Sequence, residues 1–210
     1  MAGDRSTQRR EQAEQTRRRI FDTALALLSK KGYDRVTVDE ICAKAGVSKG
    51  TFYHYFKSKD QAILEEFLKI DRYYQEVLPQ LMELEDMEER MALFCRLALR
   101  YMQAQGKNML KVAYSSQISP GRRASPVASR QRALYSIVEG LVREAQERGE
   151  ARRDLDASAV AETVIRCIRG IVYDWCLQDG RFDLEEAGEA MVALLAEGLR
   201  AGPAGRKGGR

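Results

Sequence analysis

Helix start and stop signals follow one another closely in the first third of the chain. Apolar residues recur at helical spacing over residues 16–31, and Gly32 then ends the pattern. Thr37 precedes a second periodic stretch and has a glutamate three residues later, which is typical of a capping box. Ser48 and Ser58 mark two further helix starts. These signals predict three capped helices within roughly 45 residues, followed by a longer fourth helix.

Gly46 stands between the second and third predicted helices. Glycine takes a positive φ without strain, so it permits the tight turn of a helix-turn-helix unit, whose second helix lies in the major groove of DNA. The residues placed to face inward are Ile41, Ala45, Val47, Phe52 and Tyr55, with Cys42 as the small residue where the two helices approach. The outward positions carry side chains that suit phosphate oxygens and base edges: Ser48, Lys49, Thr51, Tyr53 and His54.

The later sequence is also helical in its periodicity. Apolar faces run through residues 91–101, 109–113, 134–145, 160–175 and 184–195, and no stretch alternates as a strand does. Three of these helices are expected to start at Ser125–Pro126, near Asp156 and at Asp183. The pattern therefore predicts an all-α fold, with an N-terminal three-helix helix-turn-helix domain and a larger helical body.

Charge is divided unevenly along the chain. The net charge is +4, but residues 1–60 carry +5, residues 61–199 carry −5, and residues 200–210 carry +4. A basic N-terminal region can dock on phosphates and release counterions, whereas an acidic body is repelled by them. The distribution favours binding of an anionic polymer by the N-terminal region. A merely solvated basic region is the alternative that charge alone leaves open.

Several classes of protein are disfavoured by what the sequence lacks. It has no apolar run approaching the roughly 18 residues of a membrane span, and its N-terminus lacks the apolar core of a signal peptide, so we expect a soluble cytoplasmic protein without a membrane partner. The four cysteines form no CxxC pair, and His54 is the only histidine, so we expect reduced thiols and no metal. No phosphate-binding glycine loop or catalytic constellation surrounds His54, so we expect no cofactor and no enzyme activity.

The stretch TVDEICAKAGVSKGTFYHYFKSKDQAI, residues 37–63, resembles the DNA-binding signature of the TetR family of bacterial transcriptional regulators. The pattern Gly-Val-Ser-x-Gly-Thr-aromatic-Tyr-x-x-Phe-x-x-Lys carries the resemblance, and residues 170–175 with DGRFDLEEA are similar to the last two helices of many members. The resemblance implies an all-helical homodimer. Three N-terminal helices would bind double-stranded operator DNA, and six further helices would form a ligand-binding and dimerisation domain.

Carried over position by position, the resemblance implies DNA contacts by Thr37, Ser48, Lys49, Gly50, Thr51, Tyr53 and His54, and a phosphate contact by Lys59. Two departures from the family pattern are Cys42, where alanine is usual, and the order His54–Tyr55. Basic residues that precede or begin the first predicted helix could also pair with phosphates or enter the minor groove, or could simply be solvated. They are Arg5, Arg9, Arg10, Arg17, Arg18 and Arg19.

The expected organisation is a flexible basic arm (1–15), a DNA-binding domain (16–58), a ligand-binding and dimerisation domain (59–200) and a disordered tail (201–210). A small, apolar or aromatic effector is expected among aromatic side chains of the body: Tyr73, Tyr74, Phe94, Tyr101, Met102, Tyr114, Tyr135 and Trp175. Dimer contacts are expected from the apolar residues of the last two helices: Val164, Ile168, Ile171, Met191, Leu194 and Leu195.

The resulting functional hypothesis is a homodimeric repressor that the effector releases from a pseudo-palindromic operator. Two alternatives stay open at this point. One is a helical adaptor that binds protein through its acidic body. The other is a redox-sensing regulator acting through Cys95, Cys167 or Cys176, which requires a low thiol pKa.

Overall fold

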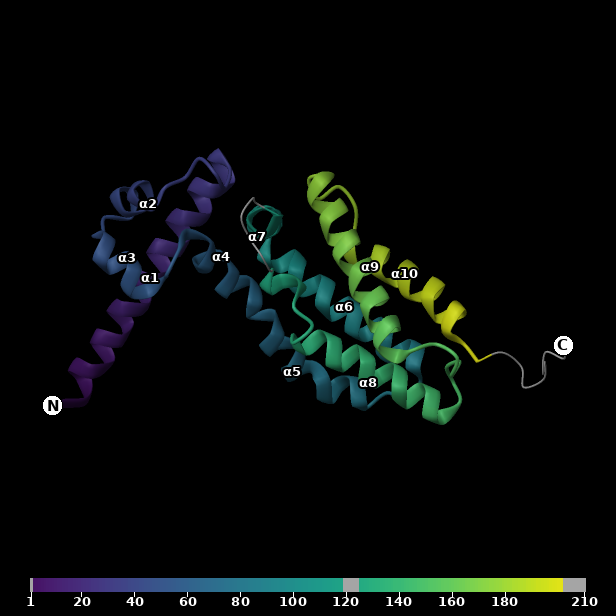
Figure 1. Ribbon diagram of the computed structural model, residues 1–210. Helices are drawn as coiled ribbons and strands as arrows, with labels where there is room; N and C mark the ends of the chain where they lie inside the picture. Colours follow the sequence, from purple (N-terminus) through teal and green to yellow (C-terminus); the bar gives the residue numbers. More distant parts are fainter. Residues whose placement is uncertain (1, 119–124, 202–210) are drawn as a thin grey trace, which may run out of the picture. The chain divides into compact units, whose positions relative to one another are not determined.

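The computed structural model describes residues 2–118 and 125–201, with side chains from Thr7 onward. Within these ranges the chain forms α-helices and one short 3-10 helix (Figure 1), and the β-structure is limited to one isolated bridge between Ala151 and Arg200. The all-α prediction is confirmed. The predicted disordered tail lies, apart from Ala201, outside the described residues.

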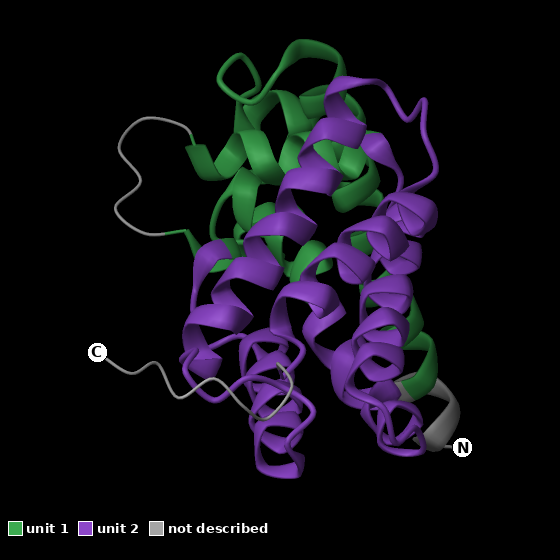
Figure 2. Ribbon diagram, turned by 90° about the vertical axis from the view of Figure 1, so that its right-hand side faces the viewer, with its two compact units in different colours: residues 1–68, 108–127 green, residues 69–107, 128–210 purple. Residues whose placement is uncertain are grey.

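The chain divides into two compact units, shown in green and purple in Figure 2. Unit 1 comprises residues 1–68 and 108–127, and unit 2 comprises residues 69–107 and 128–210. The single long fourth helix expected from the sequence is two helices, α4 (Lys59–Leu68) in unit 1 and α5 (Ile70–Met82) in unit 2.

Unit 1 is built around the first helix. Its elements are α1 (Ala2–Lys31), α2 (Val38–Ala45), α3 (Lys49–Tyr55), α4, most of α7 (Lys107–Ile118) and most of the 3-10 helix η1 (Pro126–Ala128). Helix α1 packs against α2 and α4. The shared core is made of large apolar side chains with at most 2% exposure: Ile20, Leu28, Ile41, Phe52, Phe56, Ile63 and Phe67.

Helix α1 begins much earlier than expected. The sequence placed its start near Thr16, whereas the helix runs from Ala2 over 30 residues, or about 45 Å. Residues 4–15 contain neither glycine nor proline and are rich in Gln, Glu and Arg, which favour helices even without a buried face. In Figure 1 the N-terminal turns of α1 extend away from α2 and α3, and residues 7–12 are exposed.

Unit 2 contains α5, α6 (Met87–Gln105), α8 (Ala133–Arg148), α9 (Ala157–Leu177) and α10 (Leu184–Leu199). Helix α6 packs along α10, and α8 packs along α9. Asp156 and Asp183 cap α9 and α10, as expected. The helix expected from Ser125 instead starts at Ala133. Ser125 is followed by the short 3-10 helix η1, and its hydroxyl donates to Gln117 Oε1 (2.9 Å).

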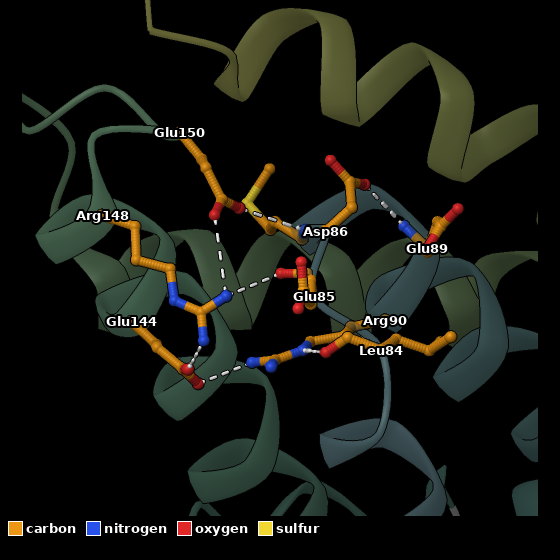
Figure 3. Close-up of polar contacts among 9 residues, drawn as sticks. Leu84, Glu85, Asp86, Glu89, Arg90, Glu144, Arg148 and Glu150 are labelled. Carbon is orange, nitrogen blue, oxygen red and sulfur yellow. Dashed lines mark hydrogen bonds and ion pairs between the residues drawn. The ribbon is translucent and has the colours of Figure 1, made fainter.

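A charged network ties the turn between α5 and α6 to the end of α8 (Figure 3). Arg90 is only 4% exposed, and its guanidinium donates to the Leu84 carbonyl (2.6 Å) and to Glu144 Oε2 (2.7 Å). Arg148 donates to the other oxygen of Glu144 (2.5 Å) and to the Glu85 carbonyl (2.7 Å). Glu144 therefore lies between two arginines, and the network as a whole links α6, α8 and the turn between α5 and α6. No helix in the described ranges is both long enough and apolar enough to cross a membrane.

Candidate DNA-binding interface and effector unit

The turn between α2 and α3 has the geometry that the sequence predicted. Gly46 adopts a left-handed conformation (φ 65°, ψ 42°), and its N–H donates to the Cys42 carbonyl. The N–H of Val47 donates to the same carbonyl at 3.1 Å. The chain thus ends α2 and reverses within two residues, so α3 starts immediately after the turn.

Hydroxyl side chains cap both helices of this motif. Thr37 Oγ1 accepts from the Glu40 N–H (3.2 Å) at the start of α2. Ser48 Oγ accepts from the Thr51 N–H (3.0 Å), and the two hydroxyls of Ser48 and Thr51 are 2.9 Å apart. Accepting a backbone N–H leaves a hydroxyl its own O–H to donate, so capping is compatible with a phosphate contact.

Helix α3 has one buried side and one exposed side. Phe52 and Phe56 are at most 1% exposed, whereas Tyr53 is 54% exposed. Ser48, Lys49, Gly50 and His54 are also exposed, and Thr51 is half-buried. Of the residues expected to face inward, Ile41, Cys42 and Ala45 are buried, while Val47 and Tyr55 are half-buried. The Tyr55 ring packs edge-on against His54, with centroids 4.9 Å apart.

The two lysines near α3 lie in different environments. Lys49, the first residue of α3, is exposed and forms an ion pair with Asp39 of α2 (2.6 Å). Lys59, the first residue of α4, is half-buried, and its ammonium donates to the carbonyls of Tyr33 (2.6 Å) and Val36 (2.8 Å). Asp39 was not singled out from the sequence, although an acidic residue in the first turn of a DNA-binding helix is a recognisable signal.

The N-terminal arginines also divide into two groups. Arg17 pairs with Glu65 (2.6 Å) and covers the Phe56 ring (5.0 Å to its centroid), and Arg18 pairs with Asp22 (3.1 Å). Arg9, Arg10 and Arg19 are exposed along α1, and the side chain of Arg5 lies outside the described part. A helix of about 10 Å diameter is too wide for a minor groove of about 6 Å, so in this conformation the backbone of the arm cannot lie in that groove.

The predicted effector residues are partly brought together. In unit 2, Tyr73 stacks on Tyr101 (4.8 Å between centroids) and Tyr74 lies against Phe94 (5.3 Å), both pairs joining α5 to α6. Tyr114 instead belongs to unit 1, where it packs edge-on against Phe67.

The remaining predicted effector residues have contacts of their own. Met102 is 6% exposed. Trp175 is 7% exposed and donates its indole N–H to the Phe182 carbonyl (3.0 Å). Arg169 lies over the Tyr135 ring at 5.7 Å. An open groove of about 310 Å³ between α5 and α8 is lined by other residues: Leu78, Met82, Ser136, Ile137, Gly140, Leu141 and Glu144.

Helices α9 and α10 present an apolar surface to solvent. A groove of about 320 Å³ between them is lined mainly by Ala159, Val160, Thr163, Val164, Leu194, Leu195 and Leu199. Leu194 is 78% exposed, whereas Val164 and Ile168 are 1% and 4% exposed, so these two are already core within one chain. Ile171, Met191 and Leu195 are half-buried.

Two exposed residues on α9 were not singled out from the sequence pattern. Tyr173 is 47% exposed and Leu177 is 65% exposed, and together with exposed Gly170 they follow at helical spacing. The spacing i, i+3, i+7 on the outer face of α9 is the signal that could have identified them.

The cysteines are free and mostly buried. Burial, reinforced by the neighbouring Cys167, raises the pKa of Cys95 to about 12. Burial also raises the pKa of Cys42. The thiolate is the reactive form of cysteine, so a redox-sensing cysteine needs a depressed pKa. The pKa values of Cys95 and Cys42 are raised instead.

Comparisons with known proteins agree with this architecture. Residues 20–66 match the family described as "Bacterial regulatory proteins, tetR family", and residues 84–199 match "Tetracyclin repressor-like, C-terminal domain". The two matches together cover the helix-turn-helix region and most of the helical body.

Individual relatives extend over most of the chain. The fatty acid metabolism regulator protein of Bacillus subtilis (strain 168) is 24% identical over 187 residues, covering 86% of this chain and 93% of the relative. Transcriptional regulator AcuR of Cereibacter sphaeroides is 33% identical over 152 residues, 68% of each chain. Thermus thermophilus FadR, a TetR-family repressor solved in complex with lauroyl-CoA, shares the fold with a TM-score of 0.67 and 24% identity, covering 92% of this chain and 100% of that one.

These relatives are transcriptional regulators and not enzymes. The N-terminal and C-terminal parts of the chain both match TetR-type families, and AcuR is 33% identical to the chain over 68% of the length of each. The chain therefore belongs to the TetR family of bacterial transcriptional regulators.

Proposed function

We propose that the protein is a homodimeric repressor that binds a pseudo-palindromic operator and is released by a small effector. The observation that carries the proposal is the exposed face of α3, which presents donors directly after the Gly46 turn. The proposed DNA contacts are Thr37, Ser48, Lys49, Gly50, Thr51, Tyr53 and His54. Gly50 allows close approach of the backbone, and the side chains bind phosphates and base edges. Such a regulator acts in the cytoplasm, where the chromosome is.

The functional boundary that we propose follows residue 58. Residues 16–58 form the DNA-binding domain, and residues 59–200 form the effector-binding and dimerisation domain. The compact unit that contains the helix-turn-helix also includes α4 and most of α7. This grouping is consistent with α4 and α7 transmitting a conformational change in the body to the DNA-binding helices. Such coupling requires the effector to bind one of two conformations of the protein more tightly than the other.

The exposed face of α9 and α10 supports dimerisation. Three large apolar side chains of this face are strongly exposed in one chain: Leu194 (78%), Leu177 (65%) and Tyr173 (47%). The groove between the two helices is largely apolar. Two copies that pack these helices as a four-helix arrangement would bury this surface. Two-fold symmetry would then place operator half-sites about 34 Å apart. Analytical ultracentrifugation at micromolar concentration tests the dimer: Leu194→Asp should shift it toward monomer, and a wild-type monomer would contradict it.

The effector that we propose has a long apolar part, and a fatty acyl-CoA thioester is the first class to test. Two of the similar proteins support this choice, a fatty acid metabolism regulator and a FadR bound to lauroyl-CoA. The aromatic pairs between α5 and α6 and the buried Met102 and Trp175 make the interior of unit 2 apolar. An apolar chain would enter such an interior more readily than a charged metabolite. The raised pKa of Cys95 gives no support to the redox alternative.

Gel-shift titrations with the DNA upstream of the gene test the regulator role. We expect a sequence-selective complex that weakens with salt and dissociates when a matching acyl-CoA is added. Trp175 is the only tryptophan, so its fluorescence reports effector binding in unit 2 independently of DNA. Effector at about 100 times its Kd should stabilise the fold by about 2.7 kcal/mol. Absence of a selective DNA complex would overturn the proposal, whereas a complex that ignores acyl-CoA would reject only the effector class.

A further inference from the structure

Arg9 and Arg10 belong to an exposed part of α1. Every side chain in residues 7–12 is exposed, so this stretch adds little buried surface to unit 1. Arg17 pairs with Glu65, whereas Arg9 and Arg10 form no ion pair with any of the described residues. The folding of unit 1 therefore does not account for these two cations.

Both arginines continue the side of α1 that packs into unit 1. Helical residues that are eleven or eighteen positions apart point in nearly the same direction, because about 3.6 residues make one turn. Arg9 is aligned in this way with Ile20 and Leu27, and Arg10 is aligned with Leu28. These three apolar side chains are at most 4% exposed. Beyond the core, the packed side of the helix thus becomes a basic side.

The acidic residues of the same stretch lie away from the centre of this side. Glu11 is aligned with Asp22, eleven residues later, which is exposed. Glu14 follows Arg10 by four residues and is rotated from it by about 40°, toward the edge of the packed side. Residues 1–15 carry three arginines and three acidic residues, so they have no net charge. Attraction of an anion therefore depends on which side of the helix it meets.

The basic side of α1 is the side toward α3. Arg17 follows Arg10 by seven residues on this side, and its guanidinium lies over the ring of Phe56, 5.0 Å from the centroid. Phe56 is the residue that ends α3, and its ring is buried, whereas Tyr53 of α3 is 54% exposed. A duplex against the exposed side of α3 therefore lies on the side of α1 that carries the two arginines.

We infer that Arg9 and Arg10 bind the phosphates of duplex DNA that flanks the operator half-site, as a helical face and not as a flexible arm. The inference rests on the proposed DNA-binding role of α3. Duplex DNA is the partner of matching charge, because it carries about one negative charge per 1.7 Å of its axis. Arg10 precedes Arg17 by about 10.5 Å along the helix, so the basic side extends the contact surface by about three base-pair steps.

The main experiment measures binding of the full-length protein to two duplexes over roughly 50–200 mM salt. One duplex carries an operator selected from a random pool and ends at its outer edges, and the other continues for about one helical turn on each side. Wild type should bind the extended duplex about tenfold more tightly at low salt. Two phosphate contacts per protomer should make the slope of log K against log salt steeper by up to about 3.6 in a dimer.

Arg9→Gln and Arg10→Gln should each remove part of this advantage and flatten the slope on the extended duplex by about 1.8. Glutamine keeps the helix propensity of arginine, so the fold is retained. Lysine at either position should restore the binding, because a phosphate also accepts a point charge. The matched control is Arg19→Gln, which removes an exposed arginine from another side of α1 and should change the slope little. Equal slopes for wild type and Arg9→Gln, or an equal flattening in Arg19→Gln, would overturn the inference.

Insertions test whether the arginines act as a face. Two alanines inserted after Gln12 rotate Arg9 and Arg10 by about 200° to the opposite side, whereas four alanines bring them back to within about 40°. The two-residue insertion should abolish the advantage of the extended duplex, and the four-residue insertion should keep most of it. Equal advantages in both variants would show a flexible arm and contradict the inference.

Binding to random-sequence duplex separates this inference from the proposed function. If no selective complex forms, the proposed repressor role fails. A flatter salt slope on random-sequence duplex for Arg9→Gln than for Arg19→Gln would still support the basic side of α1 as a DNA-binding face. If the two variants have the same slope there as well, the face does not bind DNA, and the inference fails independently.

Discussion

Asp39, the second residue of α2, holds the ammonium of Lys49, the first residue of α3, in an ion pair of 2.6 Å. Both side chains are more than 60% exposed, so the pair itself adds little to folding stability. Its position matters more, because it places a negative charge beside the face that we propose for phosphate binding. In the proposed complex with DNA, Lys49 would exchange the carboxylate for a phosphate, and Asp39 would then face the anionic backbone.

Asp39→Asn should therefore strengthen DNA binding, and strengthen binding to non-specific DNA most. Non-specific binding consists almost entirely of phosphate contacts, so removal of one nearby negative charge is expected to raise it by a few-fold to about tenfold at low salt. Competition of labelled operator against random-sequence DNA measures the ratio of the two affinities. The matched control is Asp154→Asn, which removes a carboxylate from an exposed pair with Arg152 in unit 2. Weaker binding by Asp39→Asn to both DNAs would show that Asp39 is needed to orient Lys49.

The features of the DNA-binding motif that the sequence predicted are local. Thr37 and Ser48 each cap a helix by accepting an N–H three residues ahead, and Gly46 ends α2 through its own φ. Each of these interactions joins residues at most four positions apart, so the residue types and their spacing are enough to predict them. The buried side of α3 follows in the same way from helical periodicity.

The features that the sequence did not predict join residues that are distant in the chain. Lys59 contacts carbonyls 23 and 26 positions away, and carbonyls leave no trace in residue type. Arg90 meets Glu144 across 54 positions, which periodicity cannot indicate. The early start of α1 was missed for another reason. Its first turns lack an apolar stripe, and only helix propensity predicts a helix there.

Glu144→Gln should destabilise unit 2. The substitution removes the negative charge between Arg90 and Arg148 and leaves the buried guanidinium of Arg90 without its ionic partner. Because Glu144 keeps 31% of its side chain exposed, we expect a loss of about 1–3 kcal/mol, less than for a fully buried pair. Urea unfolding measures the change. The control is Glu139→Gln on the same helix, which disrupts an i,i+4 pair with exposed Arg143 and should change stability by at most about 0.5 kcal/mol.

Gly188→Ala and Gly140→Ala should have opposite effects on stability. A Cβ built at Gly188 in α10 would lie 2.2 Å from Cδ1 of Leu99 in α6, whereas a Cβ at Gly140 in α8 meets nothing within 4 Å. Leu99 is 0% exposed, so its side chain has little room to move. Overpacking should destabilise Gly188→Ala by about 1–3 kcal/mol. Gly140→Ala should stabilise by about 0.5–1 kcal/mol, because alanine suits a helix better than glycine. A stable Gly188→Ala would show that α6 and α10 can separate at this point.

Wild-type stability should fall at alkaline pH partly because of Cys95. Burial raises the pKa of this thiol from 9.0 to about 12, so below pH 9 it is neutral in the folded and the unfolded chain, and its contribution is fully present. Between pH 9 and pH 12 the unfolded chain ionises this thiol while the folded chain does not, and stability is lost. At pH 10 the loss is about 1–2 kcal/mol.

Urea unfolding of wild type and Cys95→Ala at pH 7, 8, 9 and 10 isolates this contribution, because the tyrosines and lysines titrate equally in both. The variant loses some packing at every pH, since alanine is smaller than cysteine. What tests Cys95 is the change with pH. The wild-type advantage should stay constant from pH 7 to 8 and shrink by pH 10. A constant difference across the range would mean that the Cys95 thiol ionises as easily in the folded protein as in the unfolded chain. That result would also restore a reactive thiolate, and with it the redox alternative, because a folded thiol with an ordinary pKa could react with oxidants.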